Sequence, residues 1–362
     1  MKTTLSILII TATLFIGCKK DTVAPVVPTP PSDLTRSGKF LSFTSDKDGD
    51  QDIYIAQLEN DGTFSTQNLV YPTNPYKLTN NSTPDLQSNW SPDGRILVYS
   101  ATDANGTKEI HAFFFKSDGT IDSTINANAN PKKLFSSNGD LDQNPSFSPD
   151  GKYLIWDRRY DTDGDNVVSS SDSRNIYIGD VTGTGNDLQV SNIKPLTNTS
   201  GEDEYNPKWS PKISVRKVAY EFATSATASD HDIYVIDPLA AKPDTTNKVF
   251  FNPGNSGYPA WAPACDNIIF ESDKGNGGFY KIVKSAYPNI TNDASTDVAQ
   301  SSTQHYRYPT RAANGDKIAY IRIDAVNNLG NIYLVSVNGG VSTKLLPSSA
   351  GFDDFNNLYP AW

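Results

Sequence analysis

The segment Asn144-Pro145-Ser146-Phe147-Ser148-Pro149-Asp150-Gly151 decides the fold of this chain, because weaker copies of it recur along almost the whole sequence. Its second half predicts a tight turn, since proline presets φ, aspartate accepts local backbone hydrogen bonds, and glycine adopts a left-handed backbone at little cost. Further copies lie at residues 90–94, 206–211, 258–263 and 308–311, and a truncated copy occupies residues 359–362.

Short apolar runs surround these turns. Ile96-Leu97-Val98-Tyr99 and Tyr153-Leu154-Ile155-Trp156 each follow a turn, and such runs of aliphatic and aromatic residues are typical of buried strands. A second run comes next in each unit, as in Asp232-Ile233-Tyr234-Val235, and several units close on a third, as in Pro195-Leu196-Thr197. Each unit therefore predicts about four strands and no helix.

The spacing of the copies indicates a repeat. The aromatic residue before the turn precedes the aromatic residue of the next strand by nine positions in Trp90 and Tyr99, and again in Phe147 and Trp156. Self-similarity at about fifty residues, with four strands in each unit, is the signature of a β-propeller. Divided by six, residues 38–362 give roughly 54 residues per blade, which is long but acceptable with insertions.

The two ends of this region complement each other. The first unit begins at Gly38-Lys39-Phe40-Leu41, without an opening strand, and Tyr359-Pro360-Ala361-Trp362 is an opening strand with nothing after it. We expect the last strand to pair with the first blade and close the ring, which removes exposed sheet edges. The predicted fold is thus an all-β, six-bladed propeller of four-stranded blades, formed by residues 38–362.

A family resemblance supports this architecture. The turn Trp90-Ser91-Pro92-Asp93-Gly94, the following strand, the Asp-Ile-Tyr-Val-like run and the closing Leu-Thr resemble the TolB-type, WD-repeat-like propeller family over residues 38–362. TolB proteins carry an α/β domain before the propeller, for which the segment before residue 38 is too short. The repeat is shared by propellers joined to peptidase domains and by some polysaccharide lyases, so the resemblance implies the fold and leaves the function open.

The N-terminal segment predicts export and anchoring. Residues 1–17 read as a signal peptide, with Lys2 followed by an apolar stretch too short to span a bilayer permanently. The run Leu14-Phe15-Ile16-Gly17-Cys18 resembles a bacterial lipobox, which implies cleavage before Cys18 and lipid on that residue; the alternative is an ordinary signal peptide with an incidental cysteine. Residues 18–37 are proline-rich and predict an extended tether. The expected location is the bacterial cell envelope, on the periplasmic side or the outer surface of the outer membrane.

Composition excludes several function classes. The formal net charge is -10 and basic residues do not cluster, which argues against nucleic-acid binding. With Cys18 lipidated, only Cys265 remains, so no intrachain disulfide is expected. The three histidines are spread over three units, and no Gly-Xaa-Ser-Xaa-Gly or zinc-type motif occurs, so we predict no catalytic residue.

An acidic loop is the most specific local motif. Residues 161–172 follow the spacing of a calcium-binding loop, although Asn166 replaces the usual glycine at position six and the last ligand is aspartate instead of glutamate. The predicted Ca²⁺ ligands are Asp161, Asp163, Asp165, the Val167 carbonyl, Ser169 and Asp172. Residues 46–52 form a weaker candidate, and Asp-Gly pairs between strands are also ordinary hairpin turns.

A binding face is predicted at the loops that precede the opening strands, around the central channel. Clustered acids with aromatic residues there would suit a basic peptide, a cation or a polar glycan, and the alternative is a solvated acidic loop surface. The residues of this predicted face are Asp85, Asp142, Glu202, Asp203, Glu204, Tyr205, Tyr258, His305, Arg307, Asp353 and Tyr359.

The sequence therefore favours a monomeric, membrane-anchored envelope propeller that acts as a non-catalytic module for binding or assembling proteins. The main alternative is an enzyme acting on extracellular polysaccharide, a lyase or hydrolase with acids such as Asp142 or Glu204 as acid and base. Glycan binding without turnover is a third possibility.

Overall fold

The computed structural model describes residues 39–67, 70–124, 131–199, 201–240, 254–288, 295–312 and 315–362. The predicted signal peptide, Cys18 and the tether lie outside the described residues. In the described ranges no helix has the length and apolar character needed to cross a membrane.

Nearly all regular structure is β-strand. Two short 3-10 turns, η2 (Gly185–Asp187) and η3 (Ser348–Ala350), accompany the strands. The strands are β1 (Phe40–Ser45), β2 (Asp52–Gln57), β3 (Tyr76–Lys77), β4 (Asp85–Trp90), β5 (Ile96–Thr102), β6 (Lys108–Phe114), β7 (Lys132–Lys133), β8 (Leu141–Phe147), β9 (Tyr153–Arg159), β10 (Arg174–Thr182), β11 (Gln189–Pro195), β12 (Asp203–Trp209), β13 (Val218–Ala223), β14 (His231–Ile236), β15 (Ser256–Trp261), β16 (Asn267–Ser272), β17 (Lys281–Ala286), β18 (Thr296–Ala299), β19 (His305–Arg311), β20 (Lys317–Ile323), β21 (Gly330–Ser336), β22 (Thr343–Lys344) and β23 (Asn357–Ala361).

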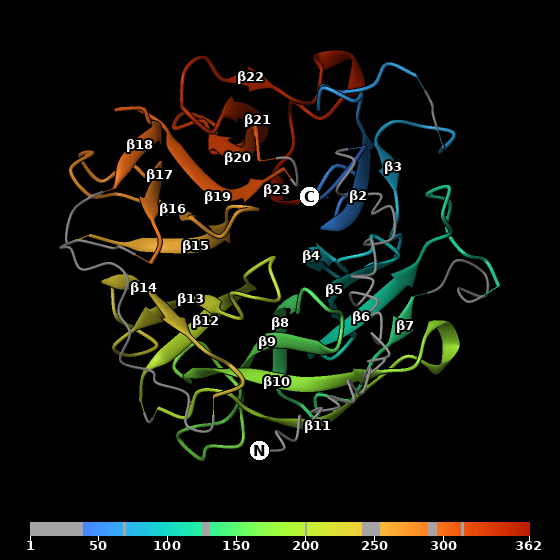
Figure 1. Cartoon of the computed structure of the whole chain (residues 1–362), viewed down its shortest axis with the longest axis vertical. Helices are drawn as coiled ribbons and strands as arrows, with labels where there is room; N and C mark the ends of the chain where they lie inside the picture. The colour runs from blue at the N-terminus through green and yellow to red at the C-terminus, as the bar shows by residue number, and fades with distance from the viewer. Residues whose placement is uncertain are drawn as a thin grey trace, which may run out of the picture. The chain divides into compact units, whose positions relative to one another are not determined.

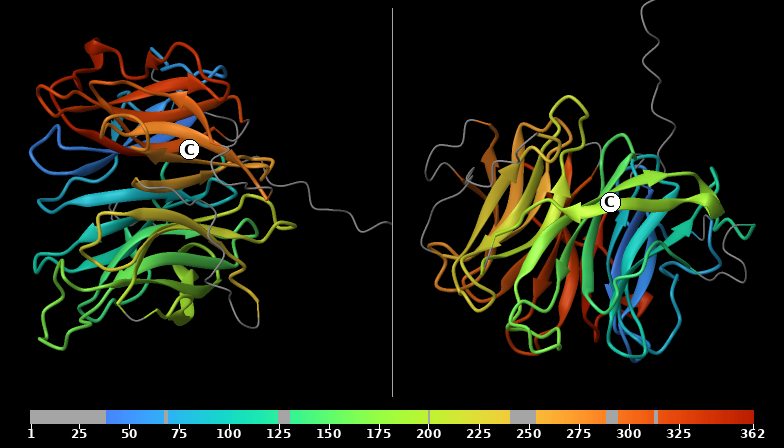
Figure 2. Two further views of the ribbon diagram at one scale, coloured as in Figure 1. Left: turned by 90° about the vertical axis from the view of Figure 1, so that its left-hand side faces the viewer. Right: turned by 90° about the horizontal axis from the view of Figure 1, so that it is seen from below.

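The strands form a ring of antiparallel sheets, which confirms the predicted β-propeller (Figure 1). Among the described residues, hydrogen bonding gives five sheets: β23-β1-β2-β3, β12-β13-β14, β15 to β18, β19 to β22, and one eight-stranded sheet containing β4 to β11. The prediction of six separate four-stranded sheets is wrong in this respect. A parallel bridge between Lys108 of β6 and Leu141 of β8 joins two groups of strands into one sheet. Figure 2 shows the strands running roughly along the axis that Figure 1 views end-on.

The predicted ring closure is confirmed. β23 lies antiparallel to β1, with Ser42 opposite Ala361 and Ser45 opposite Asn357. Next to this pairing, the Asp46 carboxylate accepts hydrogen bonds from the backbone N–H and the side-chain amide of Asn356, at 2.7 and 2.9 Å. The two ends of the described ring are therefore joined by both backbone and side-chain hydrogen bonds.

The repeated turn has the predicted geometry. Gly151 has φ of 70°, and its N–H donates to the Ser148 carbonyl at 2.9 Å, while the Ser148 hydroxyl donates to Asp150 at 2.7 Å. Cys265 takes the place of the turn glycine in a later unit, with φ of 58° and a buried side chain. Burial raises the pKa of the Cys265 thiol, which disfavours the thiolate.

The core lies between neighbouring groups of strands. In the described residues, buried apolar side chains form six clusters, and each cluster joins two groups that follow one another around the ring. Within β9, Trp156 belongs to the cluster shared with β5 and β6, whereas Ile155 belongs to the cluster shared with β12 and β13. Both faces of the strand are thus buried, which explains its continuous apolar sequence.

Candidate binding site on the propeller axis

Six inner strands surround the axis, and they share one backbone feature. β4, β8, β12, β15, β19 and β23 each contain a β-bulge, where the pairing with the next strand shifts register. One residue in each bulge has a left-handed backbone, with φ from 49° to 57°. These residues are Gln87, Asn144, Asn206, Tyr258, Tyr308 and Tyr359. A bulge re-aims side chains, so the six equivalent positions form one inner layer of the channel.

Buried carboxylates hold three of these bulges. A bulge leaves a backbone N–H without a partner in the strand ladder, and a buried N–H needs an acceptor. The N–H of Asn206 donates to Asp157 at 3.1 Å, that of Tyr258 to Glu221 at 3.1 Å, and that of Tyr308 to Glu271 at 2.8 Å. Each acid lies on the second strand of the preceding group, so each inner strand is fastened to its neighbour.

The same acids have further polar partners. Glu221 is 4% exposed, and although burial opposes its ionisation, the hydrogen bond from His231 keeps the pKa of Glu221 below its ordinary value. Arg307 donates to Glu271 at 2.6 Å, yet burial still raises the pKa of Glu271. Burial raises the pKa of Asp157 to about 6. These three groups are therefore parts of the scaffold, because each accepts a backbone N–H and a side-chain donor.

A cavity of about 480 Å³ occupies the channel between the inner layer and the Ser-Pro turns. Three amide residues of the layer, Gln87, Asn144 and Asn206, line one side, and the three tyrosines line the other. The ring centroids of Tyr258 and Tyr308 are 4.5 Å apart, and those of Tyr308 and Tyr359 are 4.6 Å apart. This contact gives the inner end of the cavity an aromatic half and an amide half.

The outer wall of the cavity is formed by the aromatic residues before each turn. Trp90, Phe147, Trp209 and Trp261 are 6 or 7% exposed, so their rings lie within the wall. Lys208 also lines the cavity, and burial lowers its pKa to about 8. The position of Lys208, one residue before the aromatic Trp209, is occupied by Ala260 and Ala361 in other inner strands. The lysine is thus a local departure from the repeat.

Several acids of the predicted binding face are buried. Asp85, Asp142 and Glu204 are fully buried, and Asp203 is 3% exposed. Asp142 accepts hydrogen bonds from Trp156 at 2.7 Å and from two nitrogens of Arg158 at 2.7 and 2.8 Å. Such a bidentate arrangement fixes neighbouring strands. Asp142 therefore has a structural environment, in contrast both to the predicted binding face and to its alternative, a solvated loop surface.

Glu204 is also bonded internally. Its carboxylate accepts hydrogen bonds from the hydroxyls of Thr197 and Thr199, and burial raises its pKa to about 8. Burial likewise raises the pKa of Asp85, to about 7. Asp203 accepts a hydrogen bond from the backbone N–H of Arg174 at 2.6 Å.

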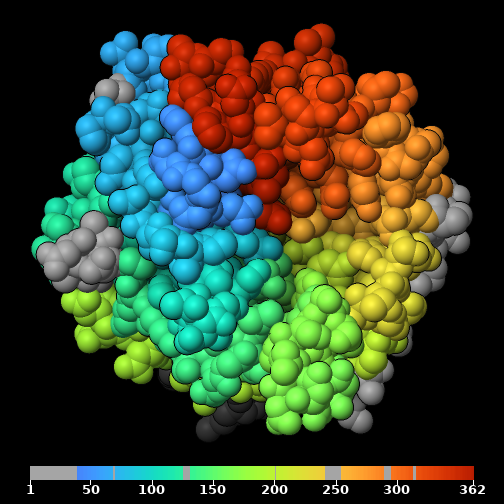
Figure 3. Space-filling model, turned by 180° about the vertical axis from the view of Figure 1, so that it is seen from behind, coloured from blue at the N-terminus to red at the C-terminus, as the bar shows by residue number. Residues whose placement is uncertain are grey.

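The remaining residues of that face do not form one group. Tyr205 contacts His231, Arg307 pairs with Glu271, and Asp353 pairs with Lys344. Glu202 and His305 are half-buried, and Tyr258 and Tyr359 line the cavity in the other half of the channel. Figure 3 shows the face that carries the loop between β9 and β10, drawn in light green; the cavity mouth is at the opposite ends of the inner strands.

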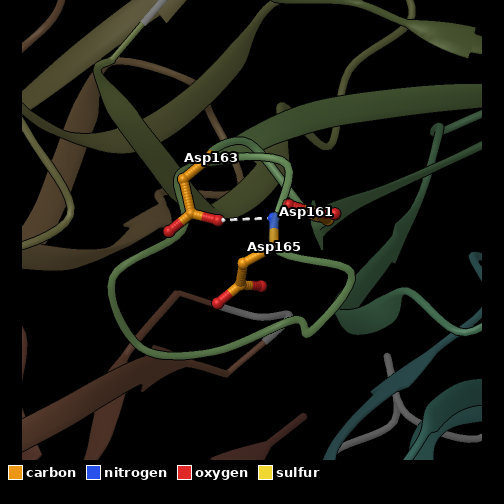
Figure 4. Close-up of side chains that lie close together, drawn as sticks. All are labelled: Asp161, Asp163 and Asp165. Atoms are coloured by element: carbon orange, nitrogen blue, oxygen red, sulfur yellow. Dashed lines mark hydrogen bonds between the residues drawn. The ribbon is translucent and has the colours of Figure 1, made fainter.

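The predicted calcium loop brings three acids together. Ligand atoms of Asp161, Asp163 and Asp165 all lie within 4.8 Å of one another, the one such group in the described part of the chain (Figure 4). Asn166 has φ of 65°, so it adopts the left-handed backbone for which glycine is usual. Asp172 is not in the group, since its two oxygens accept hydrogen bonds that close the loop, from Thr162 and Ser169 at 2.8 Å each.

Of the other two predicted ligands, Val167 donates its backbone N–H to Asp165 at 2.7 Å, and the Ser169 hydroxyl shares a hydrogen bond with that of Ser171 at 2.8 Å. In the weaker candidate for a calcium-binding loop, residues 46–52, acidic side chains pair with residues outside the loop. Asp46 binds Asn356 at the ring closure, and Lys77 pairs with Asp48 and Asp52 at 3.3 and 2.8 Å.

Comparison with known proteins agrees with this geometry. No protein-family model and no curated protein matches the sequence. Among solved structures, TolB from Acinetobacter baumannii matches 90% of this chain and 67% of its own length, with a TM-score of 0.63 and 17% identity. A putative TolB from Agrobacterium tumefaciens matches 75% of this chain and 83% of its own length, with a TM-score of 0.54 and 17% identity.

This chain has a TolB-type β-propeller fold. An oligogalacturonate lyase from Vibrio parahaemolyticus also matches, over 88% of this chain and 77% of its own length, with a TM-score of 0.53 and 14% identity. One fold serves unrelated activities, so these likenesses establish the architecture alone.

The sequence predicted two residues that line the cavity of this TolB-type propeller, Tyr258 and Tyr359, but it missed Lys208 and the buried acids that hold the bulges. A signal for the buried acids was present, because Asp157, Glu221 and Glu271 each follow the strand aromatic directly. Lys208 was visible as a cation inside the repeated Asn-Pro-Lys-Trp segment. The three acids and Lys208 are polar residues at positions where the repeat places the wall of the channel.

Proposed function

We propose that this protein is a membrane-tethered, non-catalytic binding module of the bacterial envelope, which takes an extended segment of a partner protein into the axial cavity. The observation that supports this function is the cavity of about 480 Å³, to which all six inner strands contribute. A space of this size accommodates a few side chains of a partner. The acids suggested as catalytic groups, Asp142 and Glu204, are buried and bonded internally, which favours binding over catalysis.

The experiment fills the cavity and measures capture of a partner. Thr310 lines the cavity, whereas Thr303 is exposed before the same strand, β19. Thr310→Trp should abolish recovery of a cross-linked partner from envelope membranes, and Thr303→Trp should not. Equal recovery by both variants, with both folded by circular dichroism, would place partner binding elsewhere on the molecule.

The alternatives are an enzyme that acts on extracellular polysaccharide and a protein that binds glycans without turnover. Assays of product formation and of binding on a panel of glycans distinguish them. Product formation that is lost in Asp142→Asn, while the melting temperature is kept, would replace the binding module by a lyase or hydrolase. Binding by calorimetry without product would indicate glycan recognition.

We also propose that the ring has six blades. The eight-stranded sheet then counts as two blades, β4 to β7 and β8 to β11, which are joined by the bridge between Lys108 and Leu141. Six inner strands with equivalent bulges and six apolar clusters support this number. An experimental structure with another number of inner strands around the axis would contradict it.

Anchoring through lipidated Cys18 is proposed from the lipobox-like sequence. Several acyl chains give stable attachment to a membrane, whereas a single chain does not. Labelled palmitate should enter the wild type and not Cys18→Ser, and the variant should move to the soluble fraction. Surface protease digestion would then separate the periplasmic from the outer face.

Calcium binding by Asp161, Asp163 and Asp165 is proposed as a separate property, with ligands completed by backbone oxygens and water. Millimolar Ca²⁺ should raise the melting temperature and a chelator should lower it. Asp163→Asn should abolish both effects. An unchanged melting temperature in Ca²⁺ and in chelator would remove the site.

A further inference from the structure

The axial cavity carries a charge opposite to that of the protein as a whole. The formal net charge of the chain is -10. Among the described residues that line the cavity, Lys208, Lys212 and Arg311 are cationic and none is Asp or Glu. A narrow cleft with low-dielectric walls concentrates the field of such charges, so this cavity attracts anions.

Lys208 is the innermost of these cations. It lies on β12 between the inner layer and the turn, and its side chain is half-buried. No hydrogen bond or ion pair joins its ammonium to another residue in the part of the chain that the structure describes. Burying an ammonium without a partner is unfavourable, so an anion supplied from outside would satisfy this group.

The carboxylate that interacts electrostatically with Lys208 is Asp157, and one of its oxygens already has two hydrogen-bond donors. The side-chain amide of Asn144 and the backbone N–H of Asn206 donate to one oxygen of Asp157, at 2.7 and 3.1 Å. Arg174 also interacts electrostatically with this carboxylate. Lys208 lines the cavity, whereas Asp157 does not.

The walls favour a peptide over a sugar. Binding of sugar rings uses exposed faces of aromatic side chains, and three of the four tryptophans that line the cavity, Trp90, Trp209 and Trp261, are only 6 or 7% exposed. The amide half of the inner layer, with Gln87 as one member, offers hydrogen-bonding groups suited to a peptide backbone. At the mouth, Lys212 and Arg311 lie where further acidic side chains of an extended segment would pass.

We propose that the axial cavity binds an acidic peptide segment and that Lys208 pairs with a carboxylate of that segment inside the channel. This inference rests on the proposed function and adds the chemical class of the ligand. Lys208 supplies the charge for the innermost carboxylate, and the two mouth cations attract the flanking acids. A carboxylate bound in this way replaces the missing partner of the ammonium.

The test uses the folded protein and defined probes. Tryptophan fluorescence and calorimetry at pH 7 and low salt measure binding of a hexapeptide of alternating glycine and glutamate, with the glycine–lysine hexapeptide and trigalacturonate as comparisons. The glutamate peptide should bind the wild type. Lys208→Met should weaken its affinity at least tenfold, and Lys208→Arg should restore part of it. Lys152→Met, which changes an exposed lysine of a Ser-Pro turn, should leave it unchanged.

Several results would overturn the proposal: no binding of the glutamate peptide, equal binding by wild type and Lys208→Met, equal binding of the lysine peptide, or binding of trigalacturonate alone. Failure of this inference is separable from failure of the proposed function. If Thr310→Trp abolishes partner capture while Lys208→Met does not, the cavity binds a protein whose recognition does not use this carboxylate contact.

Discussion

Replacing Lys208 by methionine should stabilise the free protein, with a characteristic dependence on pH. Burial lowers the pKa of Lys208 from 10.5 to about 8 in the folded state. Below pH 8 the Lys208 ammonium is charged in both states, and its charged form is less stable in the folded protein than in the unfolded chain. The difference between these two pKa values corresponds to an upper limit of about 3 kcal/mol of destabilisation at pH 7. As the pH rises from 8 to 10.5, the folded lysine is neutral while the unfolded lysine still binds a proton, so this penalty falls to about zero.

Chemical denaturation at pH 7, 9 and 10.5 measures the effect. Lys208→Met should exceed the wild type in unfolding free energy by up to about 3 kcal/mol at pH 7, by about 2 at pH 9 and by less than 1 at pH 10.5. Methionine also changes packing, but that contribution is constant with pH, so the change of the difference is the quantity to test. Lys152→Met controls for general loss of positive charge. A difference that stays constant with pH would refute the account, and a difference that grows as the pH rises would refute it and indicate an internal ion pair with Asp157.

Three other substitutions test the scaffold. Gly257→Ala places a Cβ 2.6 Å from the buried Glu221 carboxylate and should lower stability by about 1–3 kcal/mol in thermal melts. Asn357→Ala removes hydrogen bonds to three backbone carbonyls at the ring closure and should cost about 2 kcal/mol in urea unfolding. The raised pKa of Asp85, about 7, is a stabilising contribution below pH 4 that is lost as the pH rises through 7. The unfolding free energy of Asp85→Asn should therefore increase relative to that of the wild type as the pH rises from 4 to 8, by up to about 4 kcal/mol. A difference between the two proteins that does not change with pH would contradict the raised pKa of Asp85.

The sequence predicted those parts of the fold that local chemistry determines. The Ser-Pro-Asp-Gly turn needs a left-handed residue at its last position, and the structure places Gly151, or Cys265 in its stead, in that conformation. Ring closure followed from comparing an incomplete first unit with an incomplete last one, and β23 pairs with β1 accordingly. Both inferences need only neighbouring residues and the period of the repeat.

The inner layer was not predictable in the same way. Tyrosine rarely adopts positive φ, and a residue before proline is biased toward an extended backbone, so Tyr258-Pro259 reads as plain strand. The bulge at Tyr258 depends on Glu221, a residue 37 positions earlier on another strand. Burial of Asp142 and Glu204 likewise depends on neighbouring strands and loops. The local sequence shows these residues only as acids near the start of a strand.

The buried acids also explain how an acidic protein presents a cationic cavity. Asp157, Glu221 and Glu271 lie on the second strands of consecutive groups, and their oxygens accept the bulge N–H groups of the next inner strands. This arrangement keeps the carboxylates within the wall, so they do not line the cavity. The three carboxylates thus stabilise the wall of the channel. Lys208, in contrast, lines the cavity and has no hydrogen-bond or ion-pair partner in the described part of the chain. The electrostatic character of the cavity therefore depends on which side of the bulged strands each charged group occupies. The net charge of the chain does not predict it.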